Sequence, residues 1–192
     1  MKKIWAILSV CLLSACLGGY SPQSRFYNLQ PADASTVTVL SNRKVSIGIN
    51  EVELPDYLDR PQIVSFEKGK PQMNISELDR WGEPLASMIQ RTTAADISLY
   101  LPEAVVKPRS SLMEKFKYVV DIQIIRFDMI QGEEAVLEAW WYISDSDGRI
   151  VYRQKTMLMQ KTGKGFDSFV EAESHLLAQM SGEIARKTTS LL

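Results

Sequence analysis

The chain has 192 residues with nearly balanced charge, 22 basic against 23 acidic side chains, and a formal net charge of −1. This balance argues against nucleic acid as a partner, because binding a phosphate backbone needs a basic face. Two cysteines and one histidine are too few for a typical structural zinc site. The length suits one domain that buries its core without disulfides.

The N-terminus predicts a secretory signal peptide. A basic Met-Lys-Lys start precedes residues 4–13, a mostly apolar run that is far shorter than the roughly 20 residues that span a bilayer. The run ends in a Leu-Ser-Ala-Cys lipobox at Cys16, where a diacylglycerol is attached and the chain is cut. An ordinary signal peptide with an incidental cysteine is the alternative. We expect removal of residues 1–15, lipid on Cys16, and a tether over residues 16–24.

Cleavage would leave 177 residues with 20 basic and 23 acidic side chains, a net charge of −3, since the signal peptide holds two lysines and no acid. Residues 25–192 are expected to form a single periplasmic domain. Position 17 is leucine rather than the aspartate that favours retention at the inner membrane. We therefore expect the anchor in the inner leaflet of the outer membrane, with the domain facing the periplasm.

Four short segments in the first half have the apolar content or alternation of β-strands. They are residues 25–29, 44–52, 62–66 and 72–75. Residues 31–42 are expected to form a loop. Residues 54–61 contain two prolines, which fix the backbone and remove two donors, and predict a rigid connection. A turn at residues 67–71 is expected to join the last two strands as a hairpin.

A helix is expected from Pro84 to about Leu99. Proline is tolerated in the first turn of a helix and harmful deeper in it. The apolar residues that follow Pro84 keep near-helical spacing, and Pro102 ends the pattern. Trp81 would lie where the chain turns into this helix.

The second half predicts a sheet and a closing helix. Three segments are rich in β-branched and aromatic residues, namely residues 117–127, 133–144 and 149–161. An Asp-Gly turn at residues 145–148 joins the last two as a hairpin. The final helix has an apolar stripe, reaches about Ser190, and has Asp167 or Ser168 as its N-cap. We predict an α+β fold with a mixed or mostly antiparallel sheet and two long amphipathic helices packed on it.

Three stretches together resemble one family. The first is Val52 to Val64, which contains Leu-Pro-Asp-Tyr-Leu; the second is Asp79 to Leu85, just before the first helix. The third is the hairpin around residues 138–153, followed by the helix start at residues 165–167. In these motifs and the lipobox, nearly the whole mature chain resembles the PqiC (YmbA) family of ABC-type transport auxiliary lipoproteins.

The resemblance implies a non-enzymatic auxiliary subunit of an MCE/ABC-type, Pqi-like system that moves lipid between two membranes. Such a lipoprotein would dock an MCE-domain tunnel protein, similar to PqiB, at the outer membrane. The resemblance also implies self-association into a ring, and it implies no cofactor. The anchor and a small α+β domain are equally compatible with an outer-membrane scaffold or activator of envelope-building enzymes.

The proline-containing connection is the first candidate contact with a partner. Leu54, Pro55, Asp56, Tyr57 and Leu58 would form a rigid loop that presents Tyr57 and Leu58 to a partner or to another subunit. In a second interpretation, Pro55 sets a turn and Tyr57 fills the core.

Tryptophans supply the other candidate contacts, because this residue is enriched at interface hot spots. Trp81 is either an exposed anchor or packs the sheet under the helix. Trp140 and Trp141 are adjacent in a strand, so they point to opposite faces. One belongs to the core, and the other is covered by a helix or exposed to a partner; we take Trp141 as the candidate contact.

Residues capable of catalysis form no recognisable pattern. His175 is the only histidine, and no Gly-x-Ser-x-Gly elbow occurs, so a Ser-His-Asp triad is not expected. The acids Glu133, Glu134, Asp145 and Asp147 lie in or beside turns and are interpreted as solvated charges. We expect no catalytic residue and no metal ligand.

Overall fold

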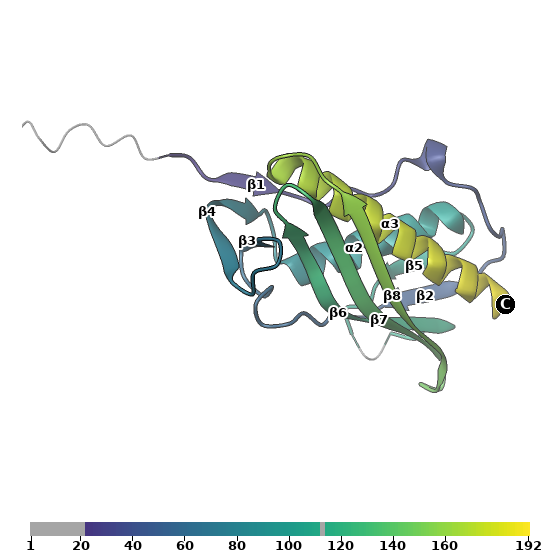
Figure 1. Cartoon of the computed structure of the whole chain (residues 1–192). Helices are drawn as coiled ribbons and strands as arrows, with labels where there is room; N and C mark the ends of the chain where they lie inside the picture. The colour runs from purple at the N-terminus through teal and green to yellow at the C-terminus, as the bar shows by residue number, and fades with distance from the viewer. Residues whose placement is uncertain (1–21, 112–113) are drawn as a thin grey trace, which may run out of the picture.

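The computed structural model describes residues 22–111 and 114–192. The expected signal peptide and Cys16 lie outside the described residues. An eight-stranded sheet and two long helices make up the fold (Figure 1), which confirms the predicted α+β class. In chain order the elements are β1 (Arg25–Tyr27), the 3₁₀ turn η2 (Ala34–Thr36), β2 (Ser46–Ile49), β3 (Gln62–Phe66), β4 (Met73–Trp81), α2 (Leu85–Tyr100), β5 (Val105–Pro108), β6 (Tyr118–Ile130), β7 (Glu134–Asp145), β8 (Ile150–Lys161) and α3 (Phe166–Ser190).

The long strand β6 organises the sheet. Along one edge it pairs antiparallel with β7, which in turn pairs antiparallel with β8. Its other edge is shared, because β2 runs parallel to its first part and β3 runs parallel to its last two residues. Strand β5 extends the sheet beyond β2, while β4 and then β1 extend it beyond β3. The sheet is therefore mixed, as predicted.

Both predicted hairpins are present. The β3–β4 hairpin forms around the expected turn, although β4 continues to Trp81, well beyond the predicted end. In the β7–β8 hairpin, Gly148 adopts a φ of +79°, a conformation that glycine reaches without steric cost. The Asp145 carboxylate accepts the backbone N–H groups of Asp147 and Arg149 (both 3.0 Å) and so stabilises the turn.

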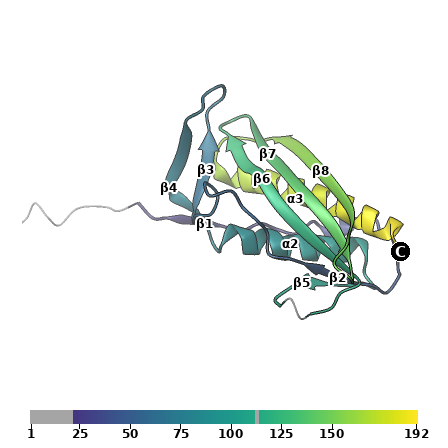
Figure 2. The same ribbon diagram turned by 90° about the horizontal axis from the view of Figure 1, so that it is seen from below.

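The two helices pack against each other, and α3 also lies against β7 and β8 (Figure 2). Helix α2 contacts β2 and β5. Fully buried residues of β6 and β7, such as Phe127 and Leu137, form one core with Leu177 and Ile184 of α3. Within the described residues, neither helix is long and apolar enough to cross a membrane.

The start of α3 differs from the prediction. Neither Asp167 nor Ser168 is the N-cap; this position is Gly165, whose φ is +97°. Ser168 instead donates its hydroxyl to the Gly165 carbonyl (3.1 Å). The sharp entry requires a positive φ, which glycine supplies more readily than a capping side chain would.

Candidate partner-binding surface

The segment between β2 and β3, which carries the Leu-Pro-Asp-Tyr-Leu motif, is fixed along the edge of β6. Glu53 donates its backbone N–H to the carbonyl of Ile122 (3.0 Å) and accepts that of Ile124 (2.9 Å). A turn follows, in which the N–H of Leu58 donates to the carbonyl of Pro55 (2.8 Å). The segment is therefore a hydrogen-bonded part of the sheet edge.

Tyr57 closes this segment over an ion pair between the half-buried Arg126 and the buried Asp128. Its hydroxyl donates to Asp128 Oδ2 (2.9 Å), and its ring packs edge-on against Phe66. Asp128 is fully buried and also accepts two hydrogen bonds from Arg126, at 2.6 and 3.2 Å. Burial first, and then repulsion from Asp128, raises the pKa of Tyr57 far above its ordinary value, so the hydroxyl remains a donor at physiological pH. The structure thus favours the interpretation in which Tyr57 packs inward.

A second buried acid lies near the same ion pair. Glu173 of α3 is fully buried, and neither of its carboxyl oxygens has a hydrogen bond of normal geometry. Burial, together with repulsion from Asp128, raises the pKa of this carboxyl well above its ordinary value, although the Val136 backbone N–H opposes the shift. A buried carboxylate without partners is costly, so burial favours the neutral form of Glu173.

The surface that this segment offers is not the one predicted. Leu58 is only 3% exposed and belongs to the core. Within this motif, Asp56 is the exposed residue, Leu54, Pro55 and Tyr57 are half-buried, and Leu58 is not accessible.

Trp81 joins the second motif to the first. Its backbone N–H donates to the carbonyl of Pro61 (2.7 Å). Its side chain is only 4% exposed and lies against Phe127 and Phe169, with both ring centroids 6.3 Å away. The structure therefore places Trp81 in the core between the sheet and α3.

A pocket of about 350 Å³ opens where the two motifs meet, with Asp59, Arg60 and Pro61 on one side and Gly82, Glu83, Pro84 and Leu85 on the other. Glu83 is held by Arg91 in a two-pronged ion pair. Arg60 has no ion pair among the described residues, and its buried Nε has no hydrogen-bond partner. The pocket is thus lined by a half-buried arginine that has no ion pair among the described residues.

Trp141 requires a correction, because its side chain is fully buried. Its indole N–H donates to Thr156 Oγ1 (3.0 Å), whose hydroxyl donates in turn to Glu183 Oε2 of α3 (2.6 Å). Trp141 therefore faces the helix layer and is not a surface contact. Trp140 is the half-buried one of the pair, and it stacks on Tyr142.

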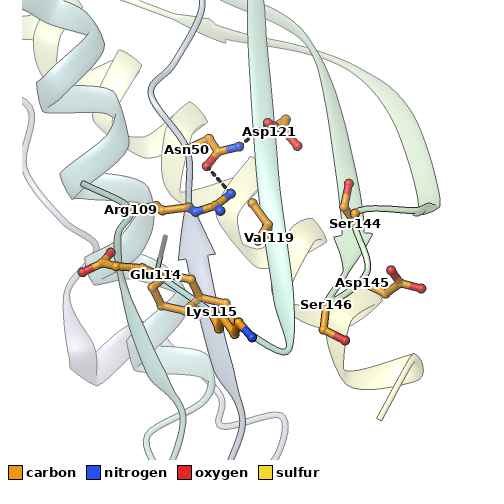
Figure 3. A pocket seen from close by; sticks show the side chains of 11 residues that line it. Asn50, Arg109, Glu114, Lys115, Val119, Asp121, Ser144, Asp145 and Ser146 are labelled. Carbon is orange, nitrogen blue, oxygen red and sulfur yellow. Dashed lines mark hydrogen bonds between the residues drawn. The ribbon is translucent and has the colours of Figure 1, made fainter. Parts of the chain in front are cut away.

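Another pocket, of about 480 Å³, opens beside the start of β6 and the β7–β8 turn (Figure 3). Asn50 links two of its charged residues, since it accepts from Arg109 (3.4 Å) and donates to Asp121 (2.6 Å). Its lining combines charges of both signs with the apolar Phe116 and Val119. His175, the only histidine of the sequence, is not part of it and lies on α3 beside Gln160. No metal-binding group of histidine and acid side chains occurs among the described residues.

The sequence analysis did not single out three residues in or beneath this region, namely the buried Asp128 and Glu173 and the half-buried Arg60. Asp128 interrupts an apolar stretch of β6, and Glu173 lies four residues before Leu177, on the apolar stripe of α3. Each was therefore visible as an acid in an apolar pattern. Arg60 carried no such signal, because its lack of an ion pair depends on the tertiary structure.

The chain belongs to the family of ABC-type transport auxiliary lipoprotein components, whose model matches residues 27–185. This match confirms the resemblance found in the sequence.

Named relatives agree with this assignment. The chain is 21% identical to the intermembrane transport lipoprotein PqiC of Escherichia coli (strain K12) over 193 residues, covering 100% of both chains. PqiC of Shigella flexneri matches equally, at 21% identity.

Solved structures share the fold. A crystal structure of an uncharacterized protein has a TM-score of 0.72 at 23% identity and covers 87% of this chain and 99% of its own. A protein from Xanthomonas campestris has a TM-score of 0.70 at 14% identity and covers 86% of this chain and 94% of its own.

Proposed function

We propose that this lipoprotein is a non-enzymatic auxiliary subunit of a Pqi-like, MCE/ABC-type lipid transport system. It docks an MCE-domain tunnel protein similar to PqiB at the outer membrane. The observation that carries the proposal is the family match over residues 27–185, and the full-length similarity to an intermembrane transport lipoprotein supports it.

The proposed organisation follows the lipobox. Residues 1–15 are a signal peptide, residues 16–24 a tether and residues 25–192 one periplasmic domain. Lipid on Cys16 holds the domain to the inner leaflet of the outer membrane. Self-association into a ring is part of the proposal, and mass photometry of the detergent-purified lipoprotein tests it, because a monomeric mass would contradict a ring.

The surface proposed to receive the tunnel protein combines Leu54 to Asp56 with the pocket at Arg60. The exposed Asp56 and the half-buried Leu54 and Pro55 offer a mixed surface on a backbone fixed to β6. Arg60 adds a cation without an ion pair among the described residues. An ion pair between the Arg60 guanidinium and a partner carboxylate contributes binding free energy without breaking an internal ion pair.

A cross-linked pull-down of the native lipoprotein from envelopes tests the function. We expect the MCE-domain protein to be recovered with the wild type and with Arg43→Glu, a control at an exposed arginine, and to be reduced about tenfold with Arg60→Glu. Recovery that Arg60→Glu leaves unchanged would move the contact to another surface. Recovery of cell-wall synthases in place of the MCE-domain protein would replace the transport role with the envelope-scaffold role.

A further inference from the structure

Exposed apolar side chains gather on β8. Eight large apolar side chains are exposed in the described part of the chain, and four of them are on this strand: Ile150, Val151, Met157 and Met159, at 62, 41, 54 and 50% exposure. Exposed apolar residues concentrated in one place mark interaction sites more often than scattered ones do. The proposed contact surface at Leu54 to Asp56 and Arg60 does not include β8, so it does not account for these exposed side chains.

The same strand has a free edge. Eleven of its twelve residues pair with β7 along one side, with Val151 unpaired at a register shift, and among residues 22–111 and 114–192 no strand pairs with the other side. In an antiparallel strand, alternate residues direct their N–H and C=O groups away from the existing partner. Long edges of this kind are templates for a further strand, and folded proteins usually shorten or cover them.

One face of β8 packs against α3, and the other is directed away from it. Gln154 and Thr156 bond to Glu183, and Gln160 lies beside His175, so this row faces α3. Alternation places the intervening residues on the opposite, outer face. This outer row consists of Arg153, Lys155, Met157, Met159 and Lys161.

The outer row places two apolar residues between cations. Lys155 is bound to Glu138 of β7 (2.6 Å), whereas Arg153 and Lys161 have no ion pair among the described residues. No acid occurs from Ile150 to Lys161. Lysine and arginine on an edge strand discourage unwanted pairing. Met157 and Met159 nevertheless leave an exposed apolar pair between Lys155 and Lys161, and methionines adapt to varied apolar partners.

We propose that β8 is a docking edge for an extended segment of the partner protein, which adds as a ninth strand and carries acidic side chains on either side of an apolar centre. Hydrogen bonds of the free edge supply the pairing, and the outer row selects the sequence. A second copy of β8 fits less well, because it would add cations to cations. The inference rests on the proposed function, since the segment belongs to the MCE-domain protein.

Photo-crosslinking of the full lipoprotein, co-expressed with the MCE-domain protein of the same organism, tests the proposal. The crosslinking residue replaces Met157 in one variant and, as a control, Val105 in another, since Val105 is 59% exposed on the edge strand β5. We expect an adduct with the MCE-domain protein from position 157 and none from position 105. Hydrogen exchange with the purified MCE-domain protein should slow at β8 amides and remain unchanged at β5.

Two sets of variants separate the apolar and the charged parts of the proposal. Met159→Asp in the apolar part of the outer row should weaken the complex about tenfold, and Val105→Asp, an exposed apolar residue changed to the same acid on β5, should leave its Kd unchanged. Arg153→Glu combined with Lys161→Glu should also weaken it about tenfold, with an effect that shrinks as salt is added.

Three outcomes would count against the proposal. An adduct between two copies of this chain would assign the edge to self-association. No adduct from position 157, while the wild-type lipoprotein still recovers the MCE-domain protein, would overturn the docking edge and leave the proposed function intact. No recovery even with the wild type would overturn the proposed function itself.

Discussion

Asp96 is a buried acid that joins three parts of the chain. It lies on α2, is fully buried, and accepts hydrogen bonds from the backbone N–H of Ala32 (2.8 Å) and from the hydroxyl of Ser181 on α3 (3.2 Å). Burial raises its pKa from 3.8 to about 6, although both hydrogen bonds act in the opposite direction. The segment after β1 is therefore attached to both helices by a group that titrates in mildly acidic solution.

The raised pKa of Asp96 makes the stability of the protein depend on pH in a defined direction. Because the pKa of Asp96 is raised on folding, its contribution to stability is fully present below about pH 4 and is lost as the pH rises through about 6. The loss amounts to about 3 kcal/mol. Asp96→Asn keeps an acceptor for Ala32 and removes the titration, so we expect it to be more stable than the wild type at pH 7 and closer to it at pH 4.

Urea unfolding of both proteins from pH 4 to pH 7 measures this difference. The exposed Asp147→Asn, a matched change at a residue whose side chain is 71% exposed, should leave the pH profile of the wild type unchanged. Parallel profiles for the wild type and Asp96→Asn would show that Asp96 does not titrate in this range.

A variant of Tyr57 can distinguish whether this residue stabilises the core or contacts a partner. Tyr57→Phe keeps the ring against Phe66 and removes the donor to the buried Asp128. We expect a loss of about 1–3 kcal/mol in the free energy of unfolding, because a buried carboxylate loses a hydrogen bond. Chemical denaturation gives the value, and Tyr142→Phe on the half-buried outer face is the control. Unchanged stability with weaker binding of the MCE-domain protein would instead show that Tyr57 contacts the partner.

At the scale of the elements, the sequence predicts those strands and helices whose formation depends on neighbouring residues. Strand β3 and both long helices follow from alternation, helical spacing and the positions of prolines. Strand β5 was not predicted, because its four residues end in Pro108 and become a strand only by pairing with β2. Alternation likewise shows that Trp140 and Trp141 face opposite ways, but the packing of α3 decides that Trp141 is the buried one. Contacts such as Tyr57 to Asp128, 71 residues apart, have no local signal at all.

The packing of α3 on the β7–β8 hairpin depends on a polar chain inside the core. Thr156 accepts the indole N–H of Trp141 and donates to Glu183. Thr156→Val preserves the shape and removes these two bonds and a third, which Thr156 accepts from Gln154 (3.3 Å), so we expect it to cost about 1–3 kcal/mol of stability. Thr93→Val is the matched control, because Thr93 is also buried but its hydroxyl has no partner among the described residues. It should be neutral or stabilising in thermal unfolding; equal losses in the two variants would contradict the role of the chain.

At the scale of the whole molecule, few residues separate the predicted anchor from the domain. The first strand starts at Arg25, nine residues after Cys16, and nine extended residues span at most about 30 Å. Figure 1 shows β1 and the β3–β4 hairpin at one end of the domain and the C-terminus at the other. If Cys16 carries lipid, the end with β1 is therefore restrained near the membrane. Restraint of this kind raises the effective concentration of a partner at the same membrane without adding a contact.

Cys16→Ser separates the anchor from the contact surface. The lipobox predicts that the variant is neither lipidated nor cut before residue 16, so it should leave the outer-membrane fraction, and its mass should lack the acyl chains found on the wild type. Recovery of the MCE-domain protein from cells should fall, because the effective concentration is lost. The Kd that the two purified proteins show in solution should be unchanged, because Cys16 lies outside the domain. A variant that remains in the outer-membrane fraction would refute the anchor, whereas a weaker Kd in solution would mean that the lipidated N-terminus itself contacts the partner.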